Sequence, residues 1–151
     1  MPQSLSVVYL HLVFSTKDRR PFLRDPILRV EMHKWLGSAS GELQCPSVLV
    51  GGVEDHVHIL ARLGRTISQA DWVKELKRTS SLWIKERDPR SWDFAWQAGY
   101  GVFSVSASNL EAVRDYIARQ DEHHTNRTYQ DEYRTLLQKH GETWDERYVW
   151  D

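Results

Sequence analysis

The amino-acid sequence predicts an α+β fold of the ferredoxin-like or RRM-like kind, in which an antiparallel sheet carries helices packed on one face. Two observations lead to this fold class. Segments with strand and helix periodicity follow one another in the order strand, helix, strand, strand, helix, strand, helix, which corresponds to two βαβ units. The 151 residues, of which 40% are hydrophobic and 27% charged, suit one compact domain.

The first two expected elements are a strand and a helix. Residues 7–15 place apolar side chains at alternate positions, which is the period of a half-buried strand. A helix is expected to open at Asp25 and Pro26, because proline is tolerated in the first turn, where its missing N–H is no loss. Gly37 and Gly41 indicate where this helix ends.

The middle of the sequence predicts a β-hairpin. Strands are expected at residues 46–50 and 56–63, which are rich in apolar and β-branched side chains. Gly51 and Gly52 between them permit a tight reversal of the chain.

Two capped helices, one strand and a last helix follow. A serine with an acid three residues later opens each of the expected helices 68–88 and 108–123. Residues 100–106 alternate as a strand between these helices. A last helix is expected at residues 129–139, with Gly141 as its C-cap.

The composition excludes several classes of protein. A net charge of −1 argues against a domain that coats nucleic acid by bulk attraction. The single Cys45 excludes an intrachain disulfide and a multi-cysteine zinc site. No apolar run approaches the ~18 residues of a spanning helix, and no signal-peptide pattern opens the chain. We therefore expect a cytoplasmic protein without a membrane partner.

The charges are nevertheless unevenly distributed. Basic residues gather near the start and in the middle of the chain, whereas acids load its end. These basic clusters are either solvated faces of helices and loops or a phosphate-binding face. The candidate phosphate-binding residues among them, which would contact DNA if the protein binds it, are Lys17, Arg19, Arg20, Lys74, Lys77 and Arg78.

A pair of histidines two residues apart lies in the expected strand 56–63. Because side chains alternate along a strand, His56 and His58 project from the same face and Val57 from the other. Two imidazoles on one face can converge on a divalent metal. The alternative is a pair of polar residues on a partly wet sheet face.

A second pair of polar residues lies on the expected helix 108–123. Tyr116 and Gln120 are four residues apart, so they point the same way, about 6 Å apart along the axis. They border an apolar stripe, and a tyrosine in that position is also compatible with ordinary half-buried packing.

Together these two motifs resemble a known pattern. The sequence His56-Val57-His58 in an internal strand, followed by Tyr116 and Gln120 on a later helix, resembles the single-tyrosine HUH transposases of the IS200-like insertion-sequence family. Four further segments resemble this family, and the last of them resembles the endings of its short, REP-associated members, so that the resemblance covers nearly the whole chain. These segments are residues 9–17, 96–106, 121–124 and 145–150.

The resemblance implies roles for the individual residues. His56, His58 and Gln120 would bind one Mg²⁺ or Mn²⁺, and Tyr116 would attack a DNA phosphate and form a 5′-phosphotyrosine intermediate. A 3′-hydroxyl could then reverse the step, so the enzyme would cleave and rejoin single-stranded DNA. His11, in the neighbouring strand, is either a residue that contacts the histidine pair and orients it toward the metal or a structural residue.

The resemblance also implies an organisation and a set of partners. Residues 1–151 would form a single HUH transposase domain, with 124–151 as a C-terminal helical extension. The partners would be single-stranded DNA with hairpin ends and a second copy of the chain in a homodimer, and no nucleotide cofactor is expected. Two alternatives are a domesticated or inactive relative that binds hairpin DNA or RNA without turnover, and an RNA-binding module that uses exposed aromatic residues on the sheet.

Overall fold

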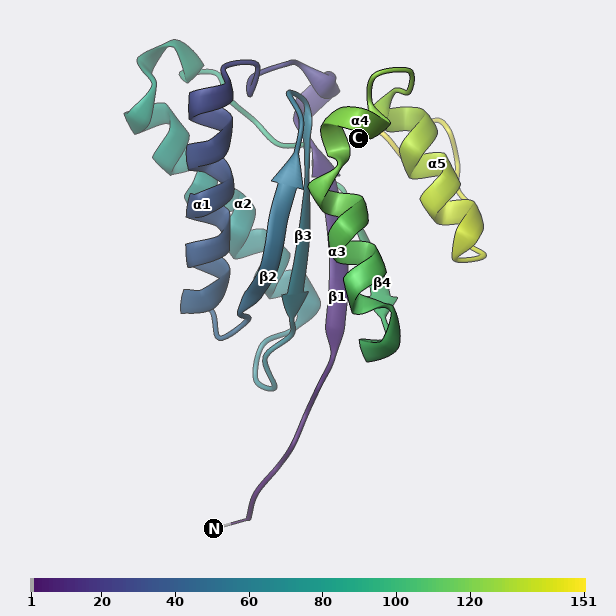
Figure 1. Ribbon diagram of the computed structural model, residues 1–151. Coiled ribbons are helices and arrows are strands. Elements are labelled where there is room, and N and C mark those ends of the chain that lie inside the picture. Colours follow the sequence, from purple (N-terminus) through teal and green to yellow (C-terminus); the bar gives the residue numbers. More distant parts are fainter. Residues whose placement is uncertain (1) are drawn as a thin grey trace.

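A computed structural model describes residues 2–151 and contains one four-stranded antiparallel sheet. The strand order is β2-β3-β1-β4, the order of a ferredoxin-like sheet, and the predicted fold class is confirmed (Figure 1). The strands are β1 (Tyr9–Ser15), β2 (Ser47–Gly52), β3 (His56–Arg62) and β4 (Gly101–Val105). The helices are α1 (Pro26–Glu42), α2 (Gln69–Arg87), α3 (Leu110–Ala118), α4 (Gln120–His123) and α5 (Tyr129–Lys139), with single 3₁₀ turns at Lys17–Arg19, Pro89–Ser91 and Ala107–Asn109.

Helices α1 and α2 cover one face of the sheet, as predicted, and enclose the main core. Leu12 and Phe14 of β1 and Ile59 of β3 point into this core, where they meet Met32 of α1 and Leu76 of α2. All five side chains are fully buried. Burying a side chain of this size stabilises the fold by about 1.5–3 kcal/mol, so this layer holds the sheet rigid.

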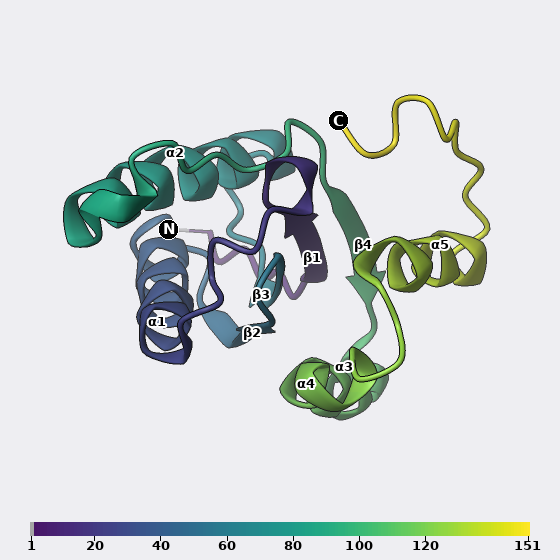
Figure 2. The ribbon, with the colours of Figure 1, turned by 90° about the horizontal axis from the view of Figure 1, so that it is seen from above.

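The opposite face is also covered, by α3, α4 and α5 (Figure 2). This arrangement adds a second layer of helices to the fold predicted from the sequence. Val13 and Phe103 on this face form a smaller core with Tyr133, Leu136 and Leu137 of α5. The histidine face of β3 is therefore a protein interior and not an open surface.

The predicted helix starts are confirmed for α1 and α2 and wrong for α3. Asp25 accepts the N–H of Ile27 at 2.9 Å, and Ser68 accepts that of Asp71 at 3.0 Å. Ser108 instead lies in a 3₁₀ turn that precedes α3. The predicted single helix 108–123 is interrupted at Arg119, whose φ and ψ of −104° and 28° separate α3 from α4.

Two glycines let the helices of the second layer approach the sheet closely. A Cβ on Gly51 would lie 2.8 Å from the carbonyl oxygen of Ile117, so this glycine allows α3 to pack against β2. A Cβ on Gly101 would lie 2.6 Å from the ring of Tyr133 in α5. The predicted tight turn at Gly51 and Gly52 is wrong, because β2 continues through Gly52 and the chain reverses over residues 53–55.

The end of the chain returns to the sheet after α5. The backbone N–H of Gly99 donates to the carbonyl of Asp151 at 2.8 Å, and Arg19 donates to the carbonyl of Trp150 at 3.0 Å. These contacts fasten the C-terminal segment, and with it α5, next to β4. Among residues 2–151, no helix has the length and apolar character that crossing a membrane requires.

Candidate functional site

Strand β3 places the two histidines of the sequence motif in the interior of the second layer. In the register of the sheet, His58 is opposite Val13 and His56 is opposite Ser15 of β1. Both imidazoles are fully buried, and their ring centroids are 5.2 Å apart. The alternation of the strand thus brings two imidazoles to one point, as the sequence predicts.

Helices α3 and α4 bring the second motif to the same point. Gln120 is buried, and its Oε1 lies 3.1 Å from Nε2 of His56. Tyr116 is half-buried, with its ring centroid 5.9 Å from that of His58. The break at Arg119 does not separate the two side chains, so all four residues of the predicted site lie together within one chain.

A carboxylate that the sequence analysis did not identify lies at the centre of this group. Glu132, from α5, is 1% exposed. Its Oε1 lies 3.1 Å from Nε2 of His56, 3.1 Å from Nε2 of His58 and 3.0 Å from Nε2 of His124. One oxygen atom therefore faces three imidazole nitrogens.

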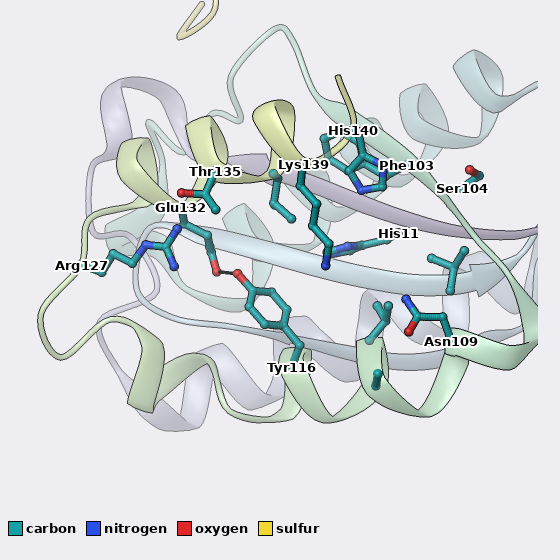
Figure 3. Close-up of a pocket in the computed structure, with 14 residues that line it drawn as sticks. His11, Phe103, Ser104, Asn109, Tyr116, Arg127, Glu132, Thr135, Lys139 and His140 are labelled. Carbon is teal, nitrogen blue, oxygen red and sulfur yellow. Dashed lines mark hydrogen bonds between the residues drawn. The ribbon is translucent and has the colours of Figure 1, made fainter. Parts of the chain in front are cut away.

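The second oxygen of this carboxylate faces the other half of the site. Oε2 of Glu132 accepts hydrogen bonds from the hydroxyl of Tyr116 and from Nε2 of Gln120, the latter at 3.1 Å. Figure 3 shows Tyr116 and Glu132 pointing toward one another from two different helices. Glu132 thus connects the tyrosine to the histidine pair.

The sequence does contain a signal for Glu132. In the expected helix 129–139, the apolar residues Tyr129, Tyr133 and Leu136 form a stripe, and Glu132 lies three residues after the first and four before the last. A carboxylate within a buried stripe is costly unless it is paired, so it is expected to have partners. What the sequence could not supply is the identity of those partners.

Glu132 and His56 carry opposite charges. Burial alone would raise the pKa of the Glu132 carboxyl, but hydrogen bonds with His124, His56 and His58 hold it well below its usual range. Burial alone would lower the pKa of His56, but hydrogen bonds with Asp55 and Glu132 raise it to about 9. The pair is therefore a buried carboxylate with an imidazolium.

His58 and His11 are neutral by contrast. Burial lowers the pKa of both rings, that of His11 to about 3. Nε2 of His11 lies 2.7 Å from Nδ1 of His58, so the two rings share one hydrogen bond. This contact fixes the His58 ring with its Nε2 toward Glu132, and a neutral imidazole is the form that binds a metal.

The hydroxyl of Tyr116 keeps its proton in this arrangement. Burial, followed by the charge and hydrogen bond of Glu132, raises the pKa of Tyr116 above its ordinary value. The ring stacks on His123 with centroids 4.5 Å apart. The side chain is therefore held in one orientation, with the oxygen at the edge of the histidine cluster.

Several of the basic residues predicted to bind DNA have partners within the chain. Lys77 donates to three backbone carbonyls at residues 97–99, at 2.7–3.1 Å. This set of contacts favours a structural role for its ammonium group. The other pairings are those of Arg19 with the Trp150 carbonyl, Arg20 with Asp93 and Arg78 with Glu75.

The donor set suits a divalent cation. His56, His58 and Glu132 offer ligand atoms that lie within 4.8 Å of one another, and all three residues are buried. Two imidazole nitrogens and a carboxylate oxygen are compatible with Mn²⁺, and with Mg²⁺ where it is abundant. The side-chain oxygen of Gln120, close to His56, adds a further donor. The residues present therefore fit a metal.

Comparisons with known proteins identify the family and the fold of the chain. Residues 4–120 match the sequence model of a family described as "Transposase IS200 like". A crystal structure from Deinococcus radiodurans R1, of a protein assigned as a transposase, has a TM-score of 0.65 and 22% identity over 80% of this chain and 95% of its own. A REP-associated tyrosine transposase bound to a REP hairpin has a TM-score of 0.59 and 12% identity over 83% and 75%. At these identities the two structures show a shared fold. No curated protein matches the chain.

Proposed function

The chain belongs to the family of IS200-like transposases, and we propose that it is a metal-dependent single-stranded DNA transposase that cleaves and rejoins DNA through a 5′-phosphotyrosine intermediate. One observation carries the proposal. The hydroxyl of Tyr116 belongs to the same hydrogen-bonded cluster as His56, His58, Gln120 and Glu132. This arrangement supports the proposal, because a candidate nucleophile and candidate metal ligands meet at one point.

In the proposed reaction Tyr116 is the nucleophile. Its oxygen forms a bond to the phosphorus of a DNA phosphodiester, and the bond from phosphorus to the 3′-oxygen breaks. The hydrogen bond to Oε2 of Glu132 positions the phenol, which loses its proton to solvent as the bond forms, and the leaving oxygen takes up a proton from water to become a 3′-hydroxyl. Attack of another 3′-hydroxyl on the phosphotyrosine reverses these steps and joins two strands without ATP.

The proposed cofactor is one Mg²⁺ or Mn²⁺, held by His56, His58 and Gln120 as the family resemblance implies, and by Glu132 as the geometry adds. When bound, the cation supplies positive charge that polarises the scissile phosphate and favours the phenolate. His11 is proposed as a positioning residue, because its contact with Nδ1 of His58 leaves Nε2 of His58 for the ligand role.

Glu132 lies outside the part of the chain that matches the family, which ends at residue 120. We therefore propose that residues 124–151 are a functional extension of a single domain formed by residues 1–151, because α5 completes the ligand set. The family resemblance also predicts a homodimer with shared sites. That dimer stays a prediction. Because Tyr116 lies beside His56 and His58 of its own chain, the structure supports a site that functions without the tyrosine of a second copy.

The proposed substrate is single-stranded DNA with hairpin ends. The similar REP-associated tyrosine transposase is bound to a REP hairpin, which supports the same class of ligand for this chain. Lys17 and Lys74 are proposed phosphate contacts, as are Arg19, Arg20 and Arg78 through their remaining N–H groups.

The test of this function is a covalent adduct. Incubating the protein with 5′- or 3′-labelled hairpin oligonucleotides and Mn²⁺ is expected to yield a labelled protein band that survives a denaturing gel. The label must follow the fragment with the 5′ end at the cut, and a chelator must prevent its formation. If the protein binds hairpins tightly yet forms no adduct with any of them, it is the alternative predicted from the sequence, a relative that binds without turnover.

A second prediction concerns the metal. Replacing His58 with alanine is expected to lower the affinity for Mn²⁺ at least about 10-fold, since a directly bound imidazole is lost. Isothermal titration calorimetry of the wild type, the His58→Ala variant and a His140→Ala control measures this, because His140 is an exposed histidine on the same side of the sheet. Equal Mn²⁺ binding by all three proteins would remove the metal site.

A further inference from the structure

A cavity of about 310 Å³ opens directly beside the proposed nucleophile. Helix α3 and helix α5 form its two walls, and strands β1 and β4 lie behind it (Figure 3). Tyr116 and Glu132 line one end, and Asn109 lies toward the other. A phosphate that Tyr116 attacks would therefore lie beside one end of this cavity.

We propose that the cavity binds the base and sugar of one unpaired nucleotide that adjoins the scissile phosphate. This inference rests on the proposed function, and it assigns to the site a subsite that reads the DNA next to the cut. The volume is at the small end of the range of ligand pockets, about 300–1,000 Å³, and suits one nucleotide. A base that is paired and stacked in a duplex cannot enter, so the nucleotide must be unpaired.

The charges of the lining favour a nucleotide. Lys139 and Arg127 bring positive charge to the two sides of the cavity, and Figure 3 shows both side chains directed toward it. The one carboxylate of the lining, Glu132, is turned to the histidine cluster through Oε1 and to Tyr116 through Oε2. The free charge toward the cavity is therefore positive, as the phosphates on either side of a nucleotide require.

The shape and polarity of the lining suit a base. Phe103 and His140 form a stacked pair, with ring centroids 4.5 Å apart and an angle of 20° between their planes, and both line the cavity. Val113 and Leu136 supply apolar walls. Such surfaces bind the flat face of a base by stacking, whatever its identity.

Asn109 adds a hydrogen-bonding side chain to the lining of the cavity. Its side-chain amide lines the cavity from an exposed position at the start of α3, and an amide offers both donors and an acceptor. Hydrogen bonds to a base edge are the means by which proteins distinguish bases. Asn109 is therefore the residue expected to give this subsite a preference.

The experiment fills the cavity with a bulky side chain. Ala112 is exposed and lines the cavity, and Ala118 is exposed on the same helix outside the lining. Ala112→Trp and, as the matched control, Ala118→Trp are made in a Tyr116→Phe protein, so that binding is measured without cleavage. The probes are one labelled hairpin without a tail, the same hairpin with a short 5′ or 3′ single-stranded tail, and tailed hairpins with an abasic position next to the stem.

We expect Ala112→Trp to lower the affinity for one of the tailed hairpins about ten-fold and to leave the affinity for the tail-free hairpin unchanged. Ala118→Trp is expected to bind both hairpins with the affinity of the Tyr116→Phe parent. The abasic position is expected to weaken binding to the parent and to leave Ala112→Trp unaffected. Asn109→Ala, a change at an exposed position, is expected to reduce the difference in affinity among tails that differ in this one base. Circular dichroism checks that each variant is folded.

Two outcomes overturn the subsite. One is an equal affinity of Ala112→Trp and Ala118→Trp for every tailed hairpin. The other is an equal loss for tailed and tail-free hairpins, which would place the effect on general DNA binding. These binding measurements need no cleavage. If the wild-type protein forms no adduct, the proposed function is wrong, but the binding measurements still decide whether the subsite exists.

Discussion

Replacing Tyr116 with phenylalanine is expected to abolish the covalent adduct and to lower strand cleavage by more than about a thousand-fold, as loss of a nucleophile does in other covalent enzymes. The substitution removes one oxygen and keeps the ring, with its stacking on His123. Glu132 loses one of the hydrogen bonds to its Oε2 and keeps that of Gln120, so the cost in stability is about 1 kcal/mol. The variant is expected to fold and to bind Mn²⁺ and hairpin DNA.

Tyr133→Phe is the matched control for this prediction. Tyr133 lies on the same side of the sheet, in the core formed with α5. Removing its hydroxyl oxygen tests whether the same substitution at another buried tyrosine also disturbs the site. Wild type and control should form equal amounts of adduct on a denaturing gel, and Tyr116→Phe none. An undiminished adduct in Tyr116→Phe would mean that another nucleophile attacks the DNA.

Local sequence signals predicted most of the fold. Alternation located β1, apolar and β-branched residues located β3, and the last helix was predicted at residues 129–139, which are the bounds of α5. The capping signal at Ser108 failed, since a 3₁₀ turn replaces the expected first turn. Packing on both faces was missed because the approach of α3 and α5 depends on contacts with the sheet that no local pattern contains.

The candidate site was likewise predicted only in part from local sequence signals. The period of a strand predicts that His56 and His58 share a face, and the period of a helix predicts that Tyr116 and Gln120 do. Glu132 was missed because its partners are distant in the chain, 74 residues away in the case of His58. A buried carboxylate can be suspected from a helical stripe, but its ligand role is a tertiary property.

Replacing Glu132 with glutamine is the most informative change at the site. The neutral amide keeps the size of the side chain and removes the negative charge that faces three imidazoles. We expect the affinity for Mn²⁺ to fall about 10- to 100-fold and the adduct to form more slowly, because the amide has one neutral oxygen and an NH₂ group in place of two carboxylate oxygens. Glu122→Gln, an equal charge change at an exposed position of α4, should match the wild type.

Glu132→Gln should also change how stability depends on pH. The pKa of His56 is raised to about 9 in the folded protein, above its ordinary value of 6.5, so its contribution is full below about pH 6.5 and is lost as the pH rises through 9. The lowered pKa of Glu132 contributes stability that is lost only in acid, below the range of this measurement. Thermal unfolding in a chelator should therefore show the melting temperature of the wild type falling between pH 6 and pH 9.5 relative to Glu132→Gln, in which Asp55 still raises the pKa of His56 but residue 132 no longer does. If the melting temperatures of the two proteins change with pH in the same way, Glu132 does not raise the pKa of His56 in the folded protein.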